Sequence, residues 1–394
     1  MWFCPSSARL SKRFFTLKGS SIYERLGLKK IINAGGRFTT LGASLMAPEV
    51  VEAMVEAARS YVVIDDLQEK ANEVIARITG AEAGYVTTGA AAGIAIATAA
   101  CMTGKDLTKI QQLPDATGMK DEVIIQRGHF IFFARMARIA GAKLVEVGDV
   151  NGTQPEQIEG AINEKTAAIL YIVSHHCVQK GIVPLEKVIE IAHRRGVPVI
   201  VDAAAEVNLN KNIALGADLV TFSGGKAIEG PGSSGILCGR KDLIEACVLQ
   251  EKNIARTMKV SKEEMVGLLA ALERYEKKDR KAEVEAWNKK AEYIADQLED
   301  LPHVTVSLVL DEAERPIKRT QLKLDEERLG FTANEVYGDL KSGNPRIFLR
   351  PHYLNLGMLL IDPRPMAEGD EVIVVNRIKE VFTKKSKEYD RKRC

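Results

Sequence analysis

Short runs of β-branched and other apolar residues alternate with helix-like stretches over the first two thirds of the chain. The runs occupy residues 121–126, 142–148, 167–174, 197–206 and 217–226. Apolar runs separated by helical segments are typical of parallel strands in a sheet that is covered on both faces. The hydrophobic pattern therefore predicts an α/β fold with a mostly parallel sheet.

The pattern changes in the last third of the chain. A charged helical pattern runs from about Ser261 to Asp300, and short strands and helices follow Pro302. This change predicts a smaller α+β domain after a long helix. The expected parts are an N-terminal extension (1–21), a large domain (22–260), a connecting helix (261–300) and a small C-terminal domain (301–394).

Composition and charge exclude some classes of protein. The 394 residues are 46% hydrophobic and 27% charged, with a formal net charge of +2. The length exceeds the roughly 100–200 residues of a single domain, and the composition is that of a globular protein. A nearly neutral chain favours neither nucleic acid nor a membrane surface as a partner. No apolar run reaches the roughly 20 residues of a membrane span.

The six cysteines are scattered along the chain without a CxxC pair. No spacing of His and Cys residues indicates a metal site. Scattered cysteines are typical of a reducing compartment, so we expect a cytoplasmic protein without a bound metal.

Residues 84–100, GYVTTGAAAGIAIATAA, join an apolar strand to an alanine-rich helix. The turn between them contains Thr88, Gly89 and Ala90. Backbone N–H groups at a helix start bind phosphate when small side chains let the ligand approach. A helix packed closely on a sheet would also favour Ala and Gly, so this motif alone leaves both interpretations open.

Two charged residues follow separate apolar runs. Asp202 ends the run VIVD, where a buried carboxylate needs a positive partner or serves as a cap. Lys226 lies 24 residues later in the small-residue loop SGGKAIEGPGSSG, three residues after Ser223. Because this separation matches one strand-to-strand crossover, we expect Asp202 and Lys226 at adjacent strand ends.

Together these features match the three groups that hold pyridoxal 5'-phosphate. A lysine in a desolvated pocket can attack a carbonyl group and bind it covalently. An acid can hold the pyridine nitrogen, and a helix start can hold the phosphate. We therefore predict this cofactor, with Lys226 and Asp202 as its main partners. The alternative for Lys226 is a solvated lysine in a surface turn.

Residues from about 22 to 382 resemble the fold-type I pyridoxal-phosphate enzymes. Within them the chain is similar to the family of selenocysteine synthase and D-glucosaminate-6-phosphate ammonia-lyase. The matching segments are IINAGGRFTTLGASLMAPEVVEAM, VTTGAAAG, DEVIIQRGHF, AGAKLVEVGD, VIVDAAAE and FSGGKAIEGPGSSGILCG. The segments QLPDATGMKDEVI and SGGKAIEGPGSSG make the ammonia-lyase branch the more similar one.

The resemblance implies a role for each matching residue. Lys226 would bind the cofactor covalently and act in catalysis, and Asp202 would contact the pyridine nitrogen. His129 would stack on the ring and move a proton, while His175 or His176 would approach the phenolic oxygen. The implied cofactor-binding residues are Thr88, Gly89, Ala90, His129, His176, Asp202, Ser223 and Lys226.

A substrate with a carboxylate and a phosphate needs cations, and the planar guanidinium of arginine binds both groups through paired hydrogen bonds. The candidates are Arg37, Arg127, Arg346 and Arg350, of which Arg37, Arg127 and Arg350 are preferred. Arg350 follows a strand in the small domain, where many fold-type I enzymes keep a carboxylate-binding arginine. Surface ion pairs are the alternative for each of them.

The resemblance implies a lyase that removes ammonia by α,β-elimination from an amino sugar acid. The expected reaction converts D-glucosaminate 6-phosphate to 2-keto-3-deoxygluconate 6-phosphate and ammonia. The alternatives are a selenocysteine synthase-like transferase acting on seryl-tRNA, a lyase or racemase for another amino acid, and a catalytically silent partner subunit. The synthases carry an N-terminal tRNA-binding domain, whereas about 20 residues precede the recognisable fold here. The resemblance also implies a homodimer or a larger homo-oligomer.

Overall fold

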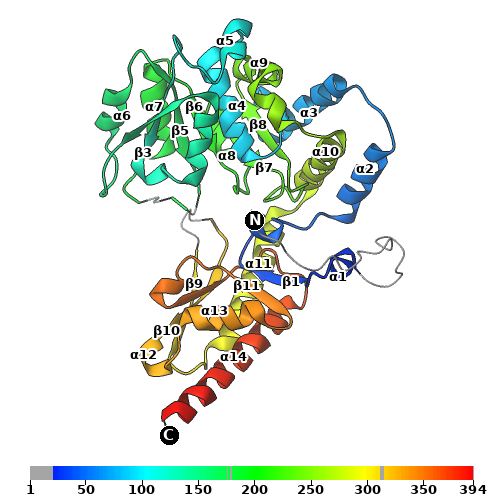
Figure 1. Ribbon diagram of the computed structural model, residues 1–394, viewed down its shortest axis with the longest axis vertical. Helices are drawn as coiled ribbons and strands as arrows, with labels where there is room; N and C mark the ends of the chain where they lie inside the picture. Colours follow the sequence, from blue (N-terminus) through cyan, green and yellow to red (C-terminus); the bar gives the residue numbers. More distant parts are fainter. Residues whose placement is uncertain (1–20, 175, 178–179, 311–314, 394) are drawn as a thin grey trace, which may run out of the picture. The chain divides into compact units, whose positions relative to one another are not determined.

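The computed structural model describes residues 21–174, 176–177, 180–310 and 315–393. The chain forms two compact units (Figure 1). The larger unit contains Arg37–Trp287 and Leu310–Lys318, and the smaller contains the described parts of Met1–Gly36, Asn288–Val309 and Arg319–Cys394. The limits of these units differ from the domain boundaries expected from the sequence. Those boundaries stay a prediction. One cause of the difference is that the strand Ile31–Ala34 pairs with Arg346–Leu349 in the smaller unit.

The larger unit is built on one seven-stranded sheet. Its strands are β2 (Ala83–Thr87), β3 (Glu122–Gln126), β4 (Lys143–Val147), β5 (Thr166–Ile172), β6 (Val199–Asp202), β7 (Leu219–Ser223) and β8 (Gly235–Gly239). They lie in the order β2-β8-β7-β6-β5-β3-β4, and only β8 runs antiparallel to its neighbours. The predicted mostly parallel sheet is confirmed.

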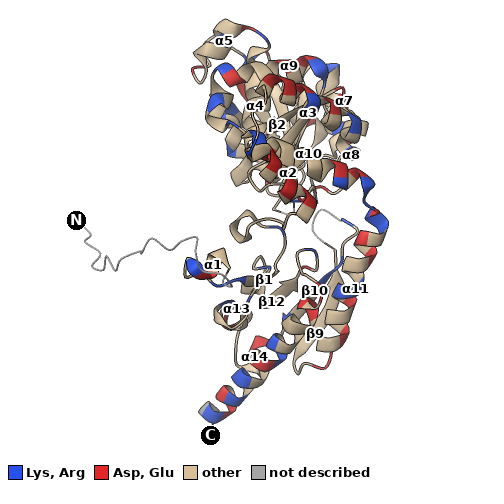
Figure 2. Ribbon diagram, turned by 90° about the vertical axis from the view of Figure 1, so that its right-hand side faces the viewer, with Lys and Arg blue, Asp and Glu red and all other residues tan. Residues whose placement is uncertain are grey.

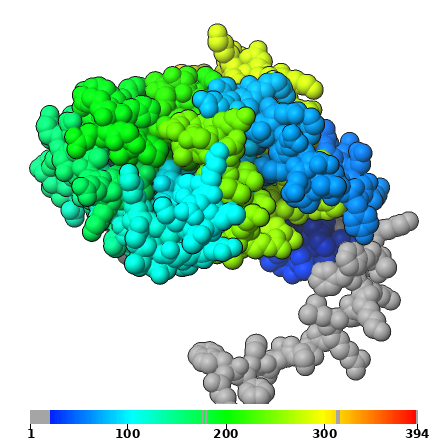
Figure 3. Space-filling model, turned by 90° about the horizontal axis from the view of Figure 1, so that it is seen from above, coloured from blue at the N-terminus to red at the C-terminus, as the bar shows by residue number. Residues whose placement is uncertain are grey.

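Helices cover both faces of this sheet. They are α2 (Pro48–Ala58), α3 (Ile64–Thr79), α4 (Ala90–Thr103), α5 (Leu107–Gln112), α6 (Pro155–Ala161), α7 (Leu185–Arg194), α8 (Lys211–Ala214), α9 (Lys241–Leu249) and α10 (Lys262–Lys277). One apolar core lies between the sheet and α3, α6, α7 and α10, and the other lies between the sheet and α4 and α9. Figure 3 shows the blue segment with α2 and α3 beside the yellow-green residues that include α10.

Helix α4 is buried almost throughout and packs against β7. A β-carbon at Gly93 would overlap with the side chain of Thr221 on that strand. The small residues of α4 therefore have a packing role as well as any role in ligand binding. Close packing of this kind fixes the start of α4 at the carboxyl edge of the sheet.

The smaller unit holds two short sheets. In one, β1 (Ile31–Ala34) pairs in parallel with β11 (Arg346–Leu349), and in the other β10 (Arg319–Leu324) lies between β9 (Val304–Val309) and β12 (Met358–Ile361), antiparallel to both. Its helices are α1 (Ile22–Arg25), α12 (Glu326–Leu329), α13 (Ala333–Ser342) and α14 (Asp370–Arg393). Figure 2 shows acidic and basic residues alternating along α14. Among the described helices, none combines the length and apolarity of a membrane span.

The single connecting helix expected over 261–300 is wrong. The segment forms α10 and a second helix, α11 (Arg280–Leu298), separated by a break at Lys278. Lys278 has an extended backbone, and its ammonium group pairs with Glu229 and Glu283. The carboxylate of Asp279 then accepts hydrogen bonds from the N–H groups of Lys281 and Ala282 and so begins α11. A helical periodicity does not reveal such a break, because the residues on both sides of it are good helix formers.

We predict that Gly93→Ala destabilises the protein by about 1–3 kcal/mol, although alanine has the higher helix propensity, because the added methyl group overpacks the contact with Thr221. Gly160→Ala in α6 is the matched control, since a β-carbon there meets no atom within 4 Å. Denaturant unfolding of both variants measures the difference. Equal stability of the two variants would contradict the packing argument.

Candidate active site

The carboxyl ends of β6 and β7 bring the two predicted key residues to adjacent strands. Asp202 is the last residue of β6 and is paired in register with Thr221 of β7. Lys226 lies in the turn that follows β7. The prediction that Asp202 and Lys226 occupy neighbouring strand ends is confirmed. Ligands in open α/β sheets bind at such carboxyl ends.

Asp202 is a buried carboxylate, 4% exposed. One carboxylate oxygen accepts a hydrogen bond of 3.1 Å from the backbone N–H of Ala204. Burial raises the pKa of Asp202, whereas the charge of Lys226 and the Ala204 hydrogen bond lower it. A cationic group placed against Asp202 would therefore stabilise its charged form.

The turn that carries Lys226 is folded closely on itself. The N–H of Gly230 donates to the carbonyl of Gly224 at 2.8 Å, and the hydroxyl of Ser44 donates to the carbonyl of Gly225 at 2.8 Å. A β-carbon at Gly225 would lie 2.9 Å from the α-carbon of Gly232. Glycine at position 225 is thus required by the packing of the loop, which holds the backbone of Lys226 in one conformation.

The turn between β2 and α4 has the geometry of an anion site. Gly89 caps α4 with a φ of +141°, a conformation that favours glycine. A β-carbon on Gly235 of β8 would lie 2.7 Å from the α-carbon of Gly89, so the two strand ends are in close contact. Thr88 is partly exposed, and the first N–H groups of a helix have no partner within it. This arrangement suits a phosphate.

His129 lies in a short 3-10 helix, Arg127–His129, that follows β3. It is fully buried, and its Nδ1 atom accepts a hydrogen bond of 3.3 Å from the N–H of Ile172. Its ring contacts Tyr171 edge to face, with 4.5 Å between the centroids. Among the described residues, none forms a hydrogen bond with the buried Nε2 atom of His129. Burial lowers the pKa of His129 to about 4, so the ring is neutral at pH 7.

The remaining predicted polar residues differ in exposure. Ser223 ends β7 and is partly buried, and its N–H donates to the carbonyl of Ala204. His176 is exposed, and its ring lies 6.1 Å from that of Phe133. His175 lies outside the described residues.

The three preferred arginines have different surroundings. Arg127 is exposed, and no carboxylate of the described residues pairs with it. Arg37 is nearly buried, donates to the carbonyl of Lys226 at 3.0 Å and pairs with Glu229 at 2.5 Å. Arg350 belongs to the smaller unit and is 1% exposed.

Arg350 is part of a buried cluster of charges around Asp362. Asp362 is ion-paired with Arg319 at 3.0 Å and with Arg364 at 2.6 Å. Although burial alone would raise the pKa of Asp362, the arginines Arg364, Arg319 and Arg350 hold it well below its usual value. Three guanidinium groups thus lie close enough to this buried carboxylate to stabilise its charged form.

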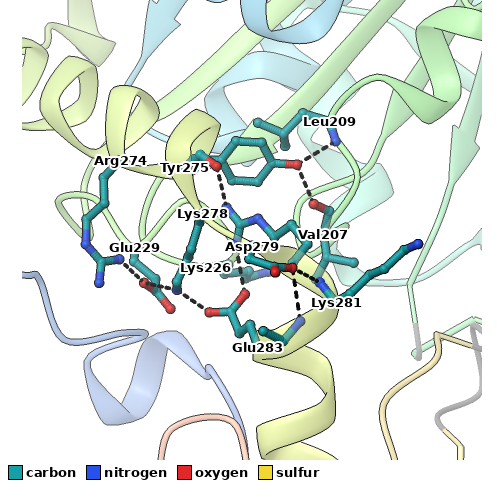
Figure 4. Close-up of polar contacts among 12 residues, drawn as sticks. Val207, Leu209, Lys226, Glu229, Arg274, Tyr275, Lys278, Asp279, Lys281 and Glu283 are labelled. Atoms are coloured by element: carbon teal, nitrogen blue, oxygen red, sulfur yellow. Dashed lines mark hydrogen bonds and ion pairs between the residues drawn. The ribbon is translucent and has the colours of Figure 1, made fainter.

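Sequence reasoning missed the residues that surround the Lys226 turn. Glu229, three residues after Lys226, is ion-paired with Arg37. It is also paired with Arg274 and Lys278, as Figure 4 shows. The signal was present, because Glu229 is the only acid in the segment SGGKAIEGPGSSG. Its partners Arg274, on α10, and Lys278, just after α10, could not be found from sequence, since they lie 45 and 49 residues away.

A cavity of about 450 Å³ also lies in the larger unit. It is bounded by Ile64 and Gln68 of α3, Tyr85 and Val86 of β2, and residues between Glu251 and Met265. None of the predicted site residues lines it. We place the site at Lys226 because a lysine, a buried acid and a helix start meet there, whereas the cavity offers volume without that chemistry.

Residues 31–301 match the family model SelA, described as L-seryl-tRNA selenium transferase. The chain belongs to the SelA family. The match spans most of the larger unit and the first strand of the smaller one. The family resemblance expected from the sequence is thus confirmed.

The relatives that this chain resembles are named for different reactions. A D-glucosaminate-6-phosphate ammonia lyase from Salmonella typhimurium is 42% identical over 92% of this chain and 98% of its own. A 5'-C-glycyluridine monooxygenase-decarboxylase from Streptomyces is 38% identical over 91% of this chain and 92% of its own. An L-seryl-tRNA(Sec) selenium transferase from Aquifex aeolicus is 30% identical over 73% of this chain and 69% of its own.

The solved structure of D-glucosaminate-6-phosphate ammonia-lyase is similar to this fold, with a TM-score of 0.83 and 41% identity. The match covers 93% of this chain and 100% of that one. The predicted fold-type I architecture is confirmed.

Pyridoxal 5'-phosphate is the cofactor that this SelA-family fold indicates. The residues present fit it. Asp202 is buried beside the positive charge of Lys226, and the space in front of Gly89 is open except for the carbonyl of Ser234 at 3.9 Å. The Nε2 atom of His129 adds a buried donor that a bound group can accept from.

We predict that His129 makes the protein less stable in acid. Its folded pKa of about 4 lies below the usual 6.5, so between these values the unfolded chain binds more protons and stability falls as pH falls. The loss is roughly 3 kcal/mol at 1.36 kcal/mol per pKa unit. Urea unfolding from pH 7 to 4 should therefore show a steeper loss for the wild type than for His129→Gln. Parallel curves would contradict the assignment of a buried, neutral ring.

Proposed function

We propose that this protein is a pyridoxal-phosphate-dependent lyase that removes ammonia by α,β-elimination from an amino sugar acid. The proposed substrate is D-glucosaminate 6-phosphate, and the products are 2-keto-3-deoxygluconate 6-phosphate and ammonia. The observation that carries this proposal is the 42% identity to an ammonia lyase over nearly the whole of both chains. The Lys226–Asp202 arrangement supplies the chemical basis.

The cofactor, when bound, withdraws electrons from the α-carbon of the amino acid attached to it. Lys226 would hold the cofactor through its Nζ atom, which the amine of the substrate would free. The Nζ atom would then take the proton from the α-carbon, and the closely packed turn holds the backbone of this lysine in place. A general acid would protonate the β-hydroxyl group, which would leave as water, and water would hydrolyse the resulting enamine to the 2-keto acid and ammonia.

The remaining cofactor residues bind and orient. Asp202 would pair with a protonated pyridine nitrogen, which would supply the positive partner that its burial demands. The N–H groups of Gly89 and Ala90 would bind the phosphate, together with the hydroxyl groups of Thr88 and Ser223. His129 donates a hydrogen bond from Nε2 to the bound cofactor or lies against its ring.

The general acid for the leaving hydroxyl is proposed to be a histidine. His129 is one candidate, but with a pKa of about 4 its ring is neutral at pH 7, and a neutral imidazole is a much weaker acid than an imidazolium. His176 is exposed and suits the role better. His129 is proposed to contact the bound cofactor. Its ring would transfer a proton only when cofactor binding changes the surroundings of the ring.

Arginines are proposed to bind the two anionic groups of the substrate. Arg127 is exposed and begins the short helix that contains His129. Arg350 is proposed because the guanidinium group binds a carboxylate or a phosphate through paired hydrogen bonds. Arg37 was also a candidate, although its guanidinium group is engaged by Glu229 and by the carbonyl of Lys226.

The alternatives lead to different substrates. A transferase that acts on seryl-tRNA needs a basic surface for nucleic acid, whereas the net charge here is +2. The identity to a selenium transferase is 30%, lower than to the ammonia lyase. A lyase or racemase for another amino acid would use the same Lys226 and Asp202.

We also propose a cytoplasmic location, because the four described cysteines are free.

We predict release of ammonia and a 2-keto acid when the cofactor-loaded protein is mixed with D-glucosaminate 6-phosphate. The unphosphorylated sugar acid should react at least about tenfold more slowly, since it lacks the phosphate that the proposed substrate-binding arginines would hold. Lys226→Ala should lose turnover by a factor of about 10³ or more and lose the visible absorption of the bound cofactor. Normal turnover by Lys226→Ala would refute the mechanism, and wild type that reacts only with another amino acid would refute the substrate.

We further propose a homodimer or a larger homo-oligomer. Large apolar side chains are exposed between α2 and α3, among them Tyr61 and Val63, and contiguous exposed apolar residues often mark an interface. Light scattering should give at least twice the mass of one chain, 43.2 kDa. A stable monomer at micromolar concentration would contradict this proposal.

A further inference from the structure

Glu229 is the centre of a charge network that faces the Lys226 turn. One of its carboxylate oxygens pairs with Arg37 at 2.5 Å, and the other pairs with Arg274 and with Lys278, each at 2.9 Å. Its side chain is 16% exposed, and that of Arg37 is 7% exposed. The network is therefore largely shielded from water, where charge pairs with good geometry interact strongly.

The backbone at Glu229 is unusual. Its φ is +60°, in the left-handed region that glycine adopts freely and that glutamate rarely adopts. A residue with a side chain persists in such a conformation only when its surroundings hold it there. The three cations paired with the carboxylate keep Glu229 in this conformation. Glycine would adopt the same conformation but would lack these ion pairs.

Arg37 connects this network to the backbone of Lys226. Its Nη1 atom donates to the carbonyl oxygen of Lys226 at 3.0 Å, and its Nη2 atom pairs with Glu229. The same carbonyl accepts the N–H of Glu229 at 3.3 Å. The guanidinium group also lies 5.3 Å from the ring centroid of Trp287. One arginine thus bridges the two ends of the turn from Lys226 to Glu229.

Arg274, on α10, and Lys278, which follows α10, each have a second ion pair. Arg274 also pairs with Glu49 on α2 at 2.9 Å, and Lys278 also pairs with Glu283 on α11. Figure 4 shows Arg274 and Lys278 on either side of the Glu229 carboxylate, with Lys226 in the same view. The network therefore fixes the turn against helices on two sides and does not depend on a single contact.

We propose that Glu229 and Arg37 are positioning residues for Lys226. They fix the backbone carbonyl of Lys226 and so set the direction in which its side chain leaves the turn. Arg37 then serves the lysine and does not bind the substrate, in contrast to the role first expected for it. The proposal rests on Lys226 as the cofactor lysine of the proposed function.

Glu229→Gly is the decisive variant. Glycine accepts the positive φ without strain and lacks only the carboxylate, so it separates the role of the backbone from the role of the side chain. Glu229→Gln keeps the size of the side chain and removes its charge. Arg37→Lys keeps a cation but cannot contact Glu229 and the Lys226 carbonyl together in the planar geometry of a guanidinium group. The control is Glu190→Gln, which removes an exposed ion pair with Lys187 on α7.

Two readouts are compared on cofactor-loaded protein. The first is visible circular dichroism without substrate, which reports how rigidly the lysine fixes the cofactor. The second is the separation of kcat from KM. For Glu229→Gly and Arg37→Lys we expect a weaker dichroic band and a kcat at least about tenfold lower, with KM changed by less than about twofold. Glu190→Gln should match the wild type in both.

Several outcomes would overturn the proposal. They are a Glu229→Gly variant with wild-type dichroism, whatever its turnover, and an Arg37→Lys variant that changes KM alone. If the thermal melt shows that Glu229→Gly does not fold, the same two readouts are taken on Glu229→Gln and Arg37→Lys. Wild-type dichroism in Glu229→Gln would then overturn the proposal. A wild type that binds cofactor but rejects D-glucosaminate 6-phosphate refutes only the proposed substrate, because the dichroism needs no substrate. A wild type without a visible band refutes the proposed function and this proposal together.

Discussion

A carboxylate buried at the end of a parallel strand needs a positive charge, and the architecture of the larger unit follows from meeting that need. Asp202 is 4% exposed, and the charge of Lys226, in the turn after β7, opposes the rise in its pKa that burial causes. The register of β6 and β7 brings the two residues together. A cofactor that offers a cationic nitrogen to Asp202 and a carbonyl group to Lys226 satisfies both residues at once.

Close packing of small residues holds this arrangement in place. Gly93 lets α4 contact β7, and Gly235 lets β8 contact the start of α4 at Gly89. The glycines after β7 let the Lys226 turn fold on itself. Around these contacts, the Glu229 network ties the turn to α2, α10 and α11 through charged groups. Close packing thus holds the start of α4 and the Lys226 turn, and ion pairs hold Glu229 at the end of that turn.

Much of the fold and part of the site could be predicted from the sequence, for identifiable reasons. The apolar runs gave β3 to β7 because strands buried on both faces leave a continuous hydrophobic signal. Asp202 and Lys226 could be placed because each directly follows such a run. The break between α10 and α11 could not be predicted, since it depends on Lys278 contacting Glu229, a residue 49 positions away. The burial of His129 and the engagement of Arg37 by Glu229 also depend on tertiary contacts that leave no local pattern.

Locating the cofactor on the chain tests these relations most directly. Borohydride reduction of the cofactor-loaded protein makes the bond between lysine and cofactor permanent, and peptide mass spectrometry then identifies the lysine. The structure predicts the added mass on the peptide that contains Lys226. Added mass on a different lysine, such as Lys259 or Lys262 beside the 450 Å³ cavity, would contradict it.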